Sequence, residues 1–193
     1  MTDDITAPDH QNLPFRMPEA LSAQGLAVRP RGADDTDFLR DLYISFRWAE
    51  LANATDWPEE ARRAFLADQF RLQDHHYTTH YLTTAFLIVT LHGAPVGRLY
   101  IDHGPDEIRL VDIVLSPEHI GRGWGTAMIR VLMDEADQTG RCVSLHVESN
   151  NPARRLYRRL GFTDRKLHGP YVFMTWGHYT GETDLSDGQL NTI

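Results

Sequence analysis

The sequence predicts a mixed α/β domain, because segments with the apolar spacing of strands and of helices alternate along most of its 193 residues. The segment from Thr126 to Asp137 carries apolar residues on one helical face, and short apolar runs, Ile113–Leu115 and Cys142–Leu145, stand on either side of it. An amphipathic helix between two buried strands indicates a helix that packs on a sheet. The apolar face of this helix consists of Met128, Ile129, Leu132, Met133 and Ala136.

The first half of the chain predicts one strand followed by two helices. Leu26–Arg29 has the composition of a short strand. Asp34 and Asp35 then suit the N-terminal cap of one helix, and Asp56 and Pro58 open another. We expect the first helix to bury Phe38, Leu39, Leu42, Tyr43 and Phe46, and the second to bury Phe65, Leu66, Phe70 and Leu72.

The second half of the chain predicts most of the sheet. Phe86–Leu91 and Val96–Ile101 are apolar strands joined by the turn His92–Pro95, which is typical of a hairpin. Tyr171–Trp176 is a late strand. Together with the elements around the central helix and a further helix that follows Asn150, these segments give the order βααβββαβαβ.

The chain divides into one domain and two tails. Residues 1–25 contain Pro8, Pro14 and Pro18 with scattered charge and no periodicity, so we expect a mobile N-terminal arm. Residues 26–177 are enough to bury a full core as a single domain. Residues 178–193 read as a polar C-terminal tail.

The composition excludes several classes of function. The chain has 19 Lys and Arg against 27 Asp and Glu, which gives a net charge of −8. Nucleic acid and anionic membranes select proteins with a positively charged surface, so we expect this acidic chain to bind neither. A single cysteine, Cys142, excludes an internal disulfide framework and a cysteine-rich zinc site. Met1–Asp4 is followed by no apolar run, so we expect a cytoplasmic protein without a signal peptide or membrane span, as a monomer or homodimer.

A glycine-rich turn separates the strand ending at Leu115 from the central helix. Gly123 and Gly125 lack a Cβ, so backbone N–H groups at the helix start can approach a ligand closely, and the helix dipole favours a pyrophosphate. A plain turn and a dinucleotide-binding turn, with Glu148 as the ribose-binding acid, are the alternatives. A Walker A loop is excluded because Thr126 follows Gly125 where that loop has a lysine.

A second motif decides between these readings. Asn150, Ala153, Tyr157 and Gly161–Phe162 follow the next strand. In this order, over about residues 108–162, the two motifs resemble the GNAT superfamily of N-acyltransferases. That family has a pyrophosphate turn of the type Arg/Gln-x-x-Gly-x-Gly/Ala and a later helix with Asn-x-x-Ala-x-x-x-Tyr.

The resemblance implies the GNAT fold, a strongly twisted mixed sheet with helices on both faces. The strand before the glycine turn is expected to carry a bulge and to splay from the strand that ends near Val147. Backbone groups of Ile113–Leu115 are then left free to pair with the pantetheine arm of CoA, much as an added strand would. The acyl thioester is expected between the two splayed strands, in the acyl-CoA cleft.

The resemblance also implies acetyl-CoA, or another acyl-CoA, as co-substrate. The chain departs from the family at Ile120, where Arg or Gln is usual, and Arg122 is expected to compensate. The family asparagine corresponds to Asn150 by its offset from Ala153 and to Asn151 by its offset from the strand, so both stay candidates. The expected cofactor-binding residues are Ile113, Val114, Leu115, Ile120, Gly121, Arg122, Gly123, Trp124, Gly125, Thr126, Asn150, Asn151, Ala153 and Tyr157.

The implied reaction is direct attack of a primary amine on the thioester. Tyr157, which matches the family tyrosine, is the expected acid for the leaving thiolate, with a core aromatic as the alternative. Asp112, His146 and Glu148 are the candidate bases, each of which could relay a proton through water. The alternative role of Asp112 is that of a buried, hydrogen-bonded carboxylate that takes no part in the reaction. For His146 we expect the role of a hydrogen-bonded structural histidine. A silent acyl-CoA-binding module and a dinucleotide-dependent oxidoreductase are the alternative functions.

The segment from Trp57 to Tyr81 is expected to cover the acceptor cleft. It mixes aromatic residues with Asp68 and Asp74, which would attract a small amine, an amino-acid-like molecule or a peptide amine. The segment also contains His75, His76 and His80. The spacing of His76 and His80 would place these two on one helical face, but no third ligand stands in a recognisable arrangement with them, so no metal is expected. The expected substrate-binding residues are Trp57, Phe70, Gln73, Tyr77 and Tyr81.

Overall fold

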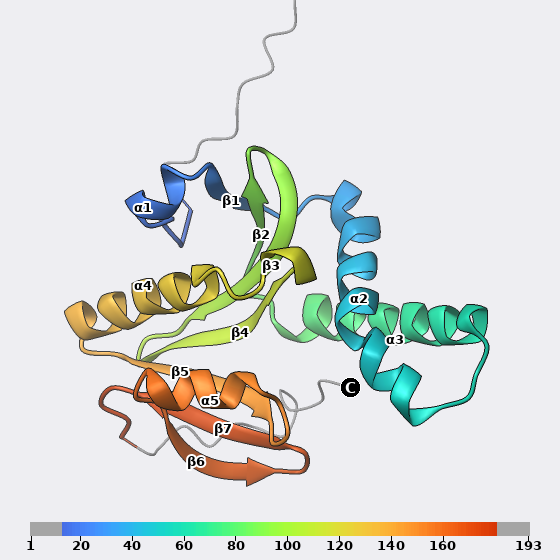
Figure 1. Ribbon diagram of the computed structural model, residues 1–193. Helices are drawn as coiled ribbons and strands as arrows, with labels where there is room; N and C mark the ends of the chain where they lie inside the picture. The colour runs from blue at the N-terminus through green and yellow to red at the C-terminus, as the bar shows by residue number, and fades with distance from the viewer. Residues whose placement is uncertain (1–12, 181–193) are drawn as a thin grey trace, which may run out of the picture.

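Seven strands form one mixed sheet in residues 13–180, the part of the chain that the computed structural model describes (Figure 1). Their order across the sheet is β1-β2-β3-β4-β5-β7-β6. The strands are β1 (Leu26–Pro30), β2 (Ala85–Leu91), β3 (Ala94–His103), β4 (Glu107–Leu115), β5 (Cys142–Glu148), β6 (Thr163–His168) and β7 (Tyr171–Trp176). The helices are α1 (Glu19–Ser22), α2 (Thr36–Ala54), α3 (Glu59–His80), α4 (Trp124–Thr139) and α5 (Ala153–Arg159), and short 3-10 turns cover Ala33–Asp35 and Pro117–His119.

The sheet opens between β4 and β5. These strands are its parallel neighbours, and they pair only where residues 107–110 face residues 142–145. Beyond that point β4 stays paired with β3 as far as Leu115, and β5 stays paired with β7 as far as Glu148. The expected splay of the two strands is therefore present, and it leaves one edge of β4 unpaired by β5.

A bulge in β4 lies where the splay begins. Asp112 faces Tyr100 of β3, whereas Leu110 faces the next β3 residue, Ile101, so Val111 is the extra residue on β4. A bulge bends its strand and increases the local twist. The position of Val111, directly after the last residue that pairs with β5, accounts for the divergence of the two strands.

Helices cover both faces of the sheet, as predicted. Side chains alternate between the two faces of a strand, so consecutive residues of β2 lie on opposite faces of the sheet. Leu87 and Val89 are buried in one core with Met128 and Leu132 of α4. Ile88 is buried in a second core with residues of α2 and α3. In Figure 1 the pair α2–α3 lies together, well apart from α4.

The mobile arm predicted for residues 1–25 is wrong for the part that the structure describes. Phe15, Met17 and Leu21, the last of them on the short helix α1, are buried in the same core as α4. Prolines interrupt this segment, so its apolar residues show no helical or strand period, although they still cover the sheet. Residues 1–12, and residues 181–193 of the predicted polar tail, lie outside the described residues.

Two further expectations were wrong. The predicted order lacks β6, an edge strand that pairs only with β7 and is exposed along most of its length. Such a strand has no buried face and therefore no apolar alternation to detect. Three aromatic or aliphatic side chains expected to face inward are exposed instead: Phe46 of α2 at 50%, and Phe65 and Leu72 of α3 at 39% and 41%. On α3 the polar Gln73 is buried.

Candidate active site

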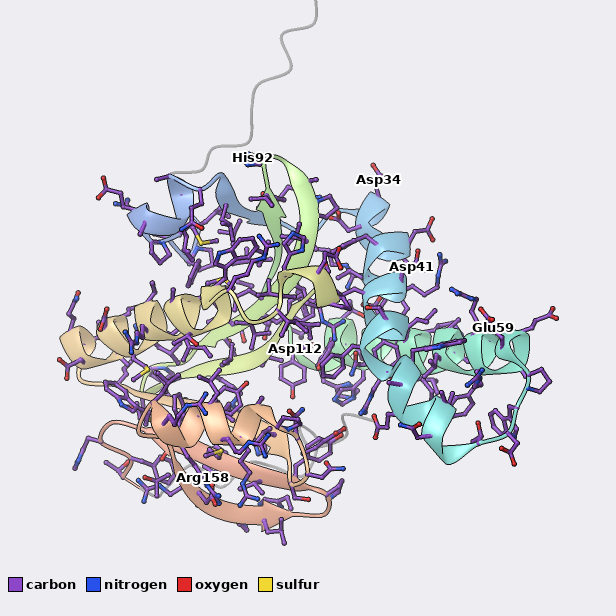
Figure 2. All side chains as sticks on the ribbon, viewed as in Figure 1. Asp34, Asp41, Glu59, His92, Asp112 and Arg158 are labelled. Atoms are coloured by element: carbon purple, nitrogen blue, oxygen red, sulfur yellow. The ribbon has the colours of Figure 1, made fainter. Side chains whose placement is uncertain are left out.

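A cavity of about 240 Å³ lies where β4 and β5 diverge. Residues 110–114 of β4 and residues 145–148 of β5 form its walls, and side chains of α2, α3, α5 and β7 complete it. Figure 2 shows Asp112 near the centre of the molecule, between the helices α2–α3 and the lower part of the sheet. The predicted cleft between the splayed strands thus exists as a cavity.

The glycine turn presents an open helix start beside this cavity. Gly123 precedes the first residue of α4 with φ 80°, a left-handed conformation that side chains other than glycine rarely adopt. A Cβ built on Gly123 would meet no atom within 4 Å, and one on Gly125 would lie 3.9 Å from Ile113 Cδ1. The first N–H groups of a helix have no intrahelical partner. The backbone here therefore fits an anionic group such as a pyrophosphate.

Side chains around the turn divide into a buried set and an exposed set. The Trp124 indole is buried and stacks on His119 with ring centroids 5.3 Å apart, so its side chain belongs to the core rather than to a ligand site. The Arg122 guanidinium lies 5.3 Å from the Trp124 ring, and its Nη2 donates to the Glu118 carbonyl over 3.3 Å. Ile120 is exposed. Arg122 is thus held at the rim of the turn, where it was expected to compensate for Ile120.

Of the two candidate asparagines, the structure brings Asn151 into the cavity. The Oδ1 atom of Asn151 accepts a hydrogen bond from the Ala153 backbone N–H over 2.9 Å and so caps the start of α5. Asn150 is exposed. Asn151, Ala153 and Tyr157 all line the cavity.

Tyr157 combines the two roles considered for it. Its ring is buried and lies 5.7 Å from the ring of Phe162, as expected of a core aromatic, yet the residue also lines the cavity. Burial, together with the negative charge of Asp112, raises the pKa of the Tyr157 phenol well above its usual value of about 10. The hydroxyl therefore stays protonated at neutral pH, as a proton or hydrogen-bond donor must.

Asp112 forms a buried ion pair that the sequence did not predict. Its Oδ2 lies 2.6 Å from Arg98 Nη2, and the Tyr77 hydroxyl lies 3.5 Å from the same oxygen. Arg98 Nη2 also donates to Gln73 Oε1 over 3.1 Å. Burial works against the Arg98 charge, but the charge of Asp112 outweighs it and raises the Arg98 pKa. The structure thus supports the alternative role of Asp112, that of a buried, hydrogen-bonded carboxylate. The sequence did contain one sign of such an ion pair, because Arg98 interrupts the apolar strand Val96–Ile101 and a buried arginine needs a partner.

Glu148 is held in a second ion pair. The Arg47 guanidinium of α2 reaches it with Nη2–Oε1 at 2.8 Å and Nη1–Oε2 at 3.3 Å, and Arg47 Nη1 also donates to Glu50 over 2.8 Å. Burial opposes the Arg47 charge, but the hydrogen bonds and charges of Glu148 and Glu50 raise its pKa. Arg47 belongs to no motif that the sequence analysis identified, so nothing in the sequence assigned it to the site.

His146 also lines the cavity. Its ring lies 5.0 Å from that of Phe173. Burial, with the positive charges of Arg109 and His168, lowers the pKa of His146 to about 4. The imidazole is therefore neutral at neutral pH.

The expected acceptor residues are only partly brought together. Gln73, Tyr77 and Tyr81 line the cavity. Phe70 packs in the α2–α3 core, 6.1 Å from the ring of Tyr43, and Trp57 lies on the surface against Phe65, so neither lines the cavity. The sequence missed three aromatic residues that do, Tyr43, Phe46 and Tyr171.

The acidic residues of the expected acceptor segment are paired with arginines. Asp74 binds Arg31, and Asp68 lies 3.5 Å from Arg71.

Further along α3, the rings of His76 and His80 stack 4.5 Å apart. Within residues 13–180, no group of three His, Cys, Asp or Glu side chains is placed to hold a metal ion. No helix in the same range is long and apolar enough to cross a membrane.

The fold, the open helix start and the cavity between splayed strands define an N-acyltransferase architecture. The chain belongs to the acetyltransferase (GNAT) family, which it matches over residues 42–162. This match confirms the predicted family, fold and enzyme class, an acyltransferase that uses acetyl-CoA as co-substrate.

Solved structures share this fold at low sequence identity. The PaiA N-acetyltransferase of Thermoplasma acidophilum, in complex with coenzyme A, is 16% identical with a TM-score of 0.58, and the match covers 79% of this chain and 99% of that one. PH1933 of Pyrococcus horikoshii is 16% identical (TM-score 0.57; 80% and 99% covered). An acetyltransferase of Thermus thermophilus is 19% identical (TM-score 0.57; 79% and 97% covered). No curated protein matches the chain.

Proposed function

We propose that the protein acetylates a primary amine, and that the preferred acceptor is an α-amine, either of a small molecule or of a peptide. The observation that carries the proposal is the position of the protonated Tyr157 phenol in the cavity between the splayed strands. A hydrogen-bond donor in this cavity supports attack on a thioester whose sulfur we expect between the splayed strands. The family match supports catalysis over a silent binding module or an oxidoreductase.

Backbone groups would hold the co-substrate. The start of α4 after Gly123 fits the pyrophosphate, and the edge of β4 that β5 leaves unpaired fits the pantetheine amides. Ile113 and Val114 line the cavity at this edge. When bound, acetyl-CoA supplies the acetyl group as an activated thioester.

Tyr157 would assist departure of the thiolate. The amine lone pair forms the new C–N bond while the C–S bond breaks, so negative charge develops on sulfur. An ordinary thiol has a pKa of about 8.5, below that of the Tyr157 phenol, so complete proton transfer from the phenol is uphill. Tyr157 therefore acts mainly through a hydrogen bond to sulfur that strengthens as charge develops, and the thiolate takes its proton from water.

The proposed roles of Asp112 and Glu148 are positioning rather than proton abstraction. Asp112 is paired with Arg98 and Glu148 with Arg47, and protonating either carboxylate would leave a partly or fully buried guanidinium without its partner. His146 is neutral, but its low pKa makes it a weak base. We infer that water receives the proton of the acceptor amine.

Because the site offers no strong base to deprotonate the acceptor, we expect it to favour amines whose pKa is low. At pH 7 an α-amine with a pKa of about 8 loses its proton at a cost of about 1.4 kcal/mol, whereas a lysine-type amine at about 10.4 costs about 4.6 kcal/mol. The pairing of Asp68 and Asp74 with arginines also removes the attraction that those residues would offer to a cationic side chain. A cytoplasmic location, a monomeric or dimeric state and the absence of nucleic-acid partners stay predictions from composition.

Thiol release from acetyl-CoA over a panel of amines tests the proposal. We expect α-amines to be acetylated faster than lysine side chains, and Tyr157→Phe to lower turnover by roughly 10²-fold while acetyl-CoA affinity holds, because the ring still packs. Thermal stabilisation by CoA, with NAD as the control, measures binding separately. Stabilisation by NAD alone, or a Phe variant with full turnover when chemistry limits the rate, would contradict it.

A further inference from the structure

A second cavity lies beside the active site, between α2 and α3. It also has a volume of about 240 Å³. Leu51, Phe65 and Leu66 give it an apolar wall. Phe65 belongs to the large apolar side chains that are exposed on this protein, at 39%. An exposed aromatic residue at the wall of a cavity is typical of a binding site.

The two cavities meet at two side chains. Tyr43 and Arg47 line both. The Arg47 guanidinium reaches Glu148 of the active site with Nη2 and Glu50 at the second cavity with Nη1, each over 2.8 Å. Arg47 therefore stands at the junction and is anchored on both sides of it. A molecule bound in the active site that extends past Tyr43 and Arg47 enters the second cavity between α2 and α3.

The size and lining of the second cavity specify what fits there. An apolar cavity of about 150 Å³ holds a benzene-sized molecule. A cavity of about 240 Å³ accepts an aromatic or branched aliphatic side chain. The ion pairs of Arg47 with Glu50 and Glu148 satisfy the charged groups at its entrance, so a neutral apolar group has no unpaired charge to displace.

We propose that the second cavity is the side-chain subsite of the acceptor, and that the acceptor is an α-amine carrying a leucine- or phenylalanine-like group. The inference rests on the proposed acetylation of an α-amine and specifies its substrate class. The amine lies between the splayed strands, and its side chain passes Tyr43 and Arg47 to contact Leu51, Phe65 and Leu66.

Leucinamide and glycinamide are the matched probes, because both present an α-amine without a free carboxylate that would bind Arg47. We expect the wild type to acetylate leucinamide with a kcat/KM roughly tenfold or more above that of glycinamide. Leu51→Trp, which fills the second cavity, and Phe65→Ser, which removes its apolar wall, should reduce this preference to less than about threefold and leave glycinamide unchanged. Leu72→Ser is the control, since Leu72 is equally exposed on α3 but lines neither cavity.

Equal rates for the two amides in the wild type, or an unchanged preference in both variants, would overturn the subsite. Calorimetric binding of leucinamide in the presence of CoA separates this failure from failure of the proposed function. Binding that Leu51→Trp abolishes, without acetylation of any amine, would keep the subsite and refute the reaction. Acetylation of both amides at one rate would keep the reaction and refute the subsite, and neither binding nor acetylation would refute both.

Discussion

The proposed CoA half and the proposed acceptor half of the cleft draw on different parts of the chain. The turn before α4, the free edge of β4 and the start of α5 come from one stretch of about fifty residues and offer mostly backbone groups. The acceptor half uses side chains of α2, α3, β5 and β7, and its ion pair Arg47–Glu148 joins residues 101 positions apart. A backbone site leaves a local motif in the sequence, whereas a side-chain site assembled across the fold leaves none.

The largest predicted effect is the loss of stability when Arg98 is replaced. Arg98→Met leaves the Asp112 carboxylate without its partner in a largely buried position, and we expect a loss of about 3–5 kcal/mol in the free energy of unfolding, measured by urea denaturation. The double variant Arg98→Met with Asp112→Leu should recover most of it, since neither charge is then buried.

Arg40→Met provides the control for the Arg98 experiment. Arg40 pairs with Asp37 and Asp41 on the exposed side of α2, and its removal should cost less than about 1 kcal/mol. If Arg98→Met were no more destabilising than Arg40→Met, the Arg98–Asp112 pair would contribute no more to stability than an exposed pair.

A smaller effect concerns the pH dependence of stability through His146. The unfolded chain binds a proton at His146 near pH 6.5, but the folded protein binds it only near pH 4 because of burial and the charge of Arg109. The unfolded state therefore holds more protons between these values, and stability present above pH 6.5 is lost as the pH falls. This group should account for about 2 kcal/mol of the loss between pH 7.5 and pH 5.

His146→Phe keeps a ring against Phe173 and should remove that part of the pH dependence. Chemical denaturation at the two pH values measures it. An identical loss on acidification in wild type and His146→Phe would show that other groups carry it.

The smallest predicted effect concerns the backbone half. Gly123→Val introduces a β-branched residue at φ 80°, so the first turn of α4 must shift, and we expect acetyl-CoA affinity to fall roughly tenfold while the protein stays folded. The thermal shift produced by acetyl-CoA measures this. Gly169→Val is matched in backbone strain, with φ 53° and no atom near its Cβ, but lies in the turn between β6 and β7. Equal acetyl-CoA shifts in both variants would contradict a role for the α4 start.

The sequence predicted every element with a buried face and a clear period, including α4 and the hairpin of β2 and β3. It missed β6, which is exposed, and α1, whose neighbours Phe15 and Met17 pack without a period. In the site it pointed to Tyr157 and the glycine turn, whose roles stay predictions, and it kept both asparagines because Asn150 has the family offset from Ala153 and Asn151 the family offset from the strand. The cavity lining and the capping bond from the Ala153 N–H to Asn151 Oδ1 separate them.

The sequence by itself determined the family and carried the proposal for the CoA half, because glycine positions and helix starts act through the local backbone. Tertiary structure alone decided that Asp112 and Glu148 are held by Arg98 and Arg47, that Trp57 and Phe70 stay outside the cavity, and that a second cavity adjoins it. The physical reason is that charge pairing and cavity shape depend on which side chains the fold brings within a few ångströms, and spacing along the chain does not record that distance.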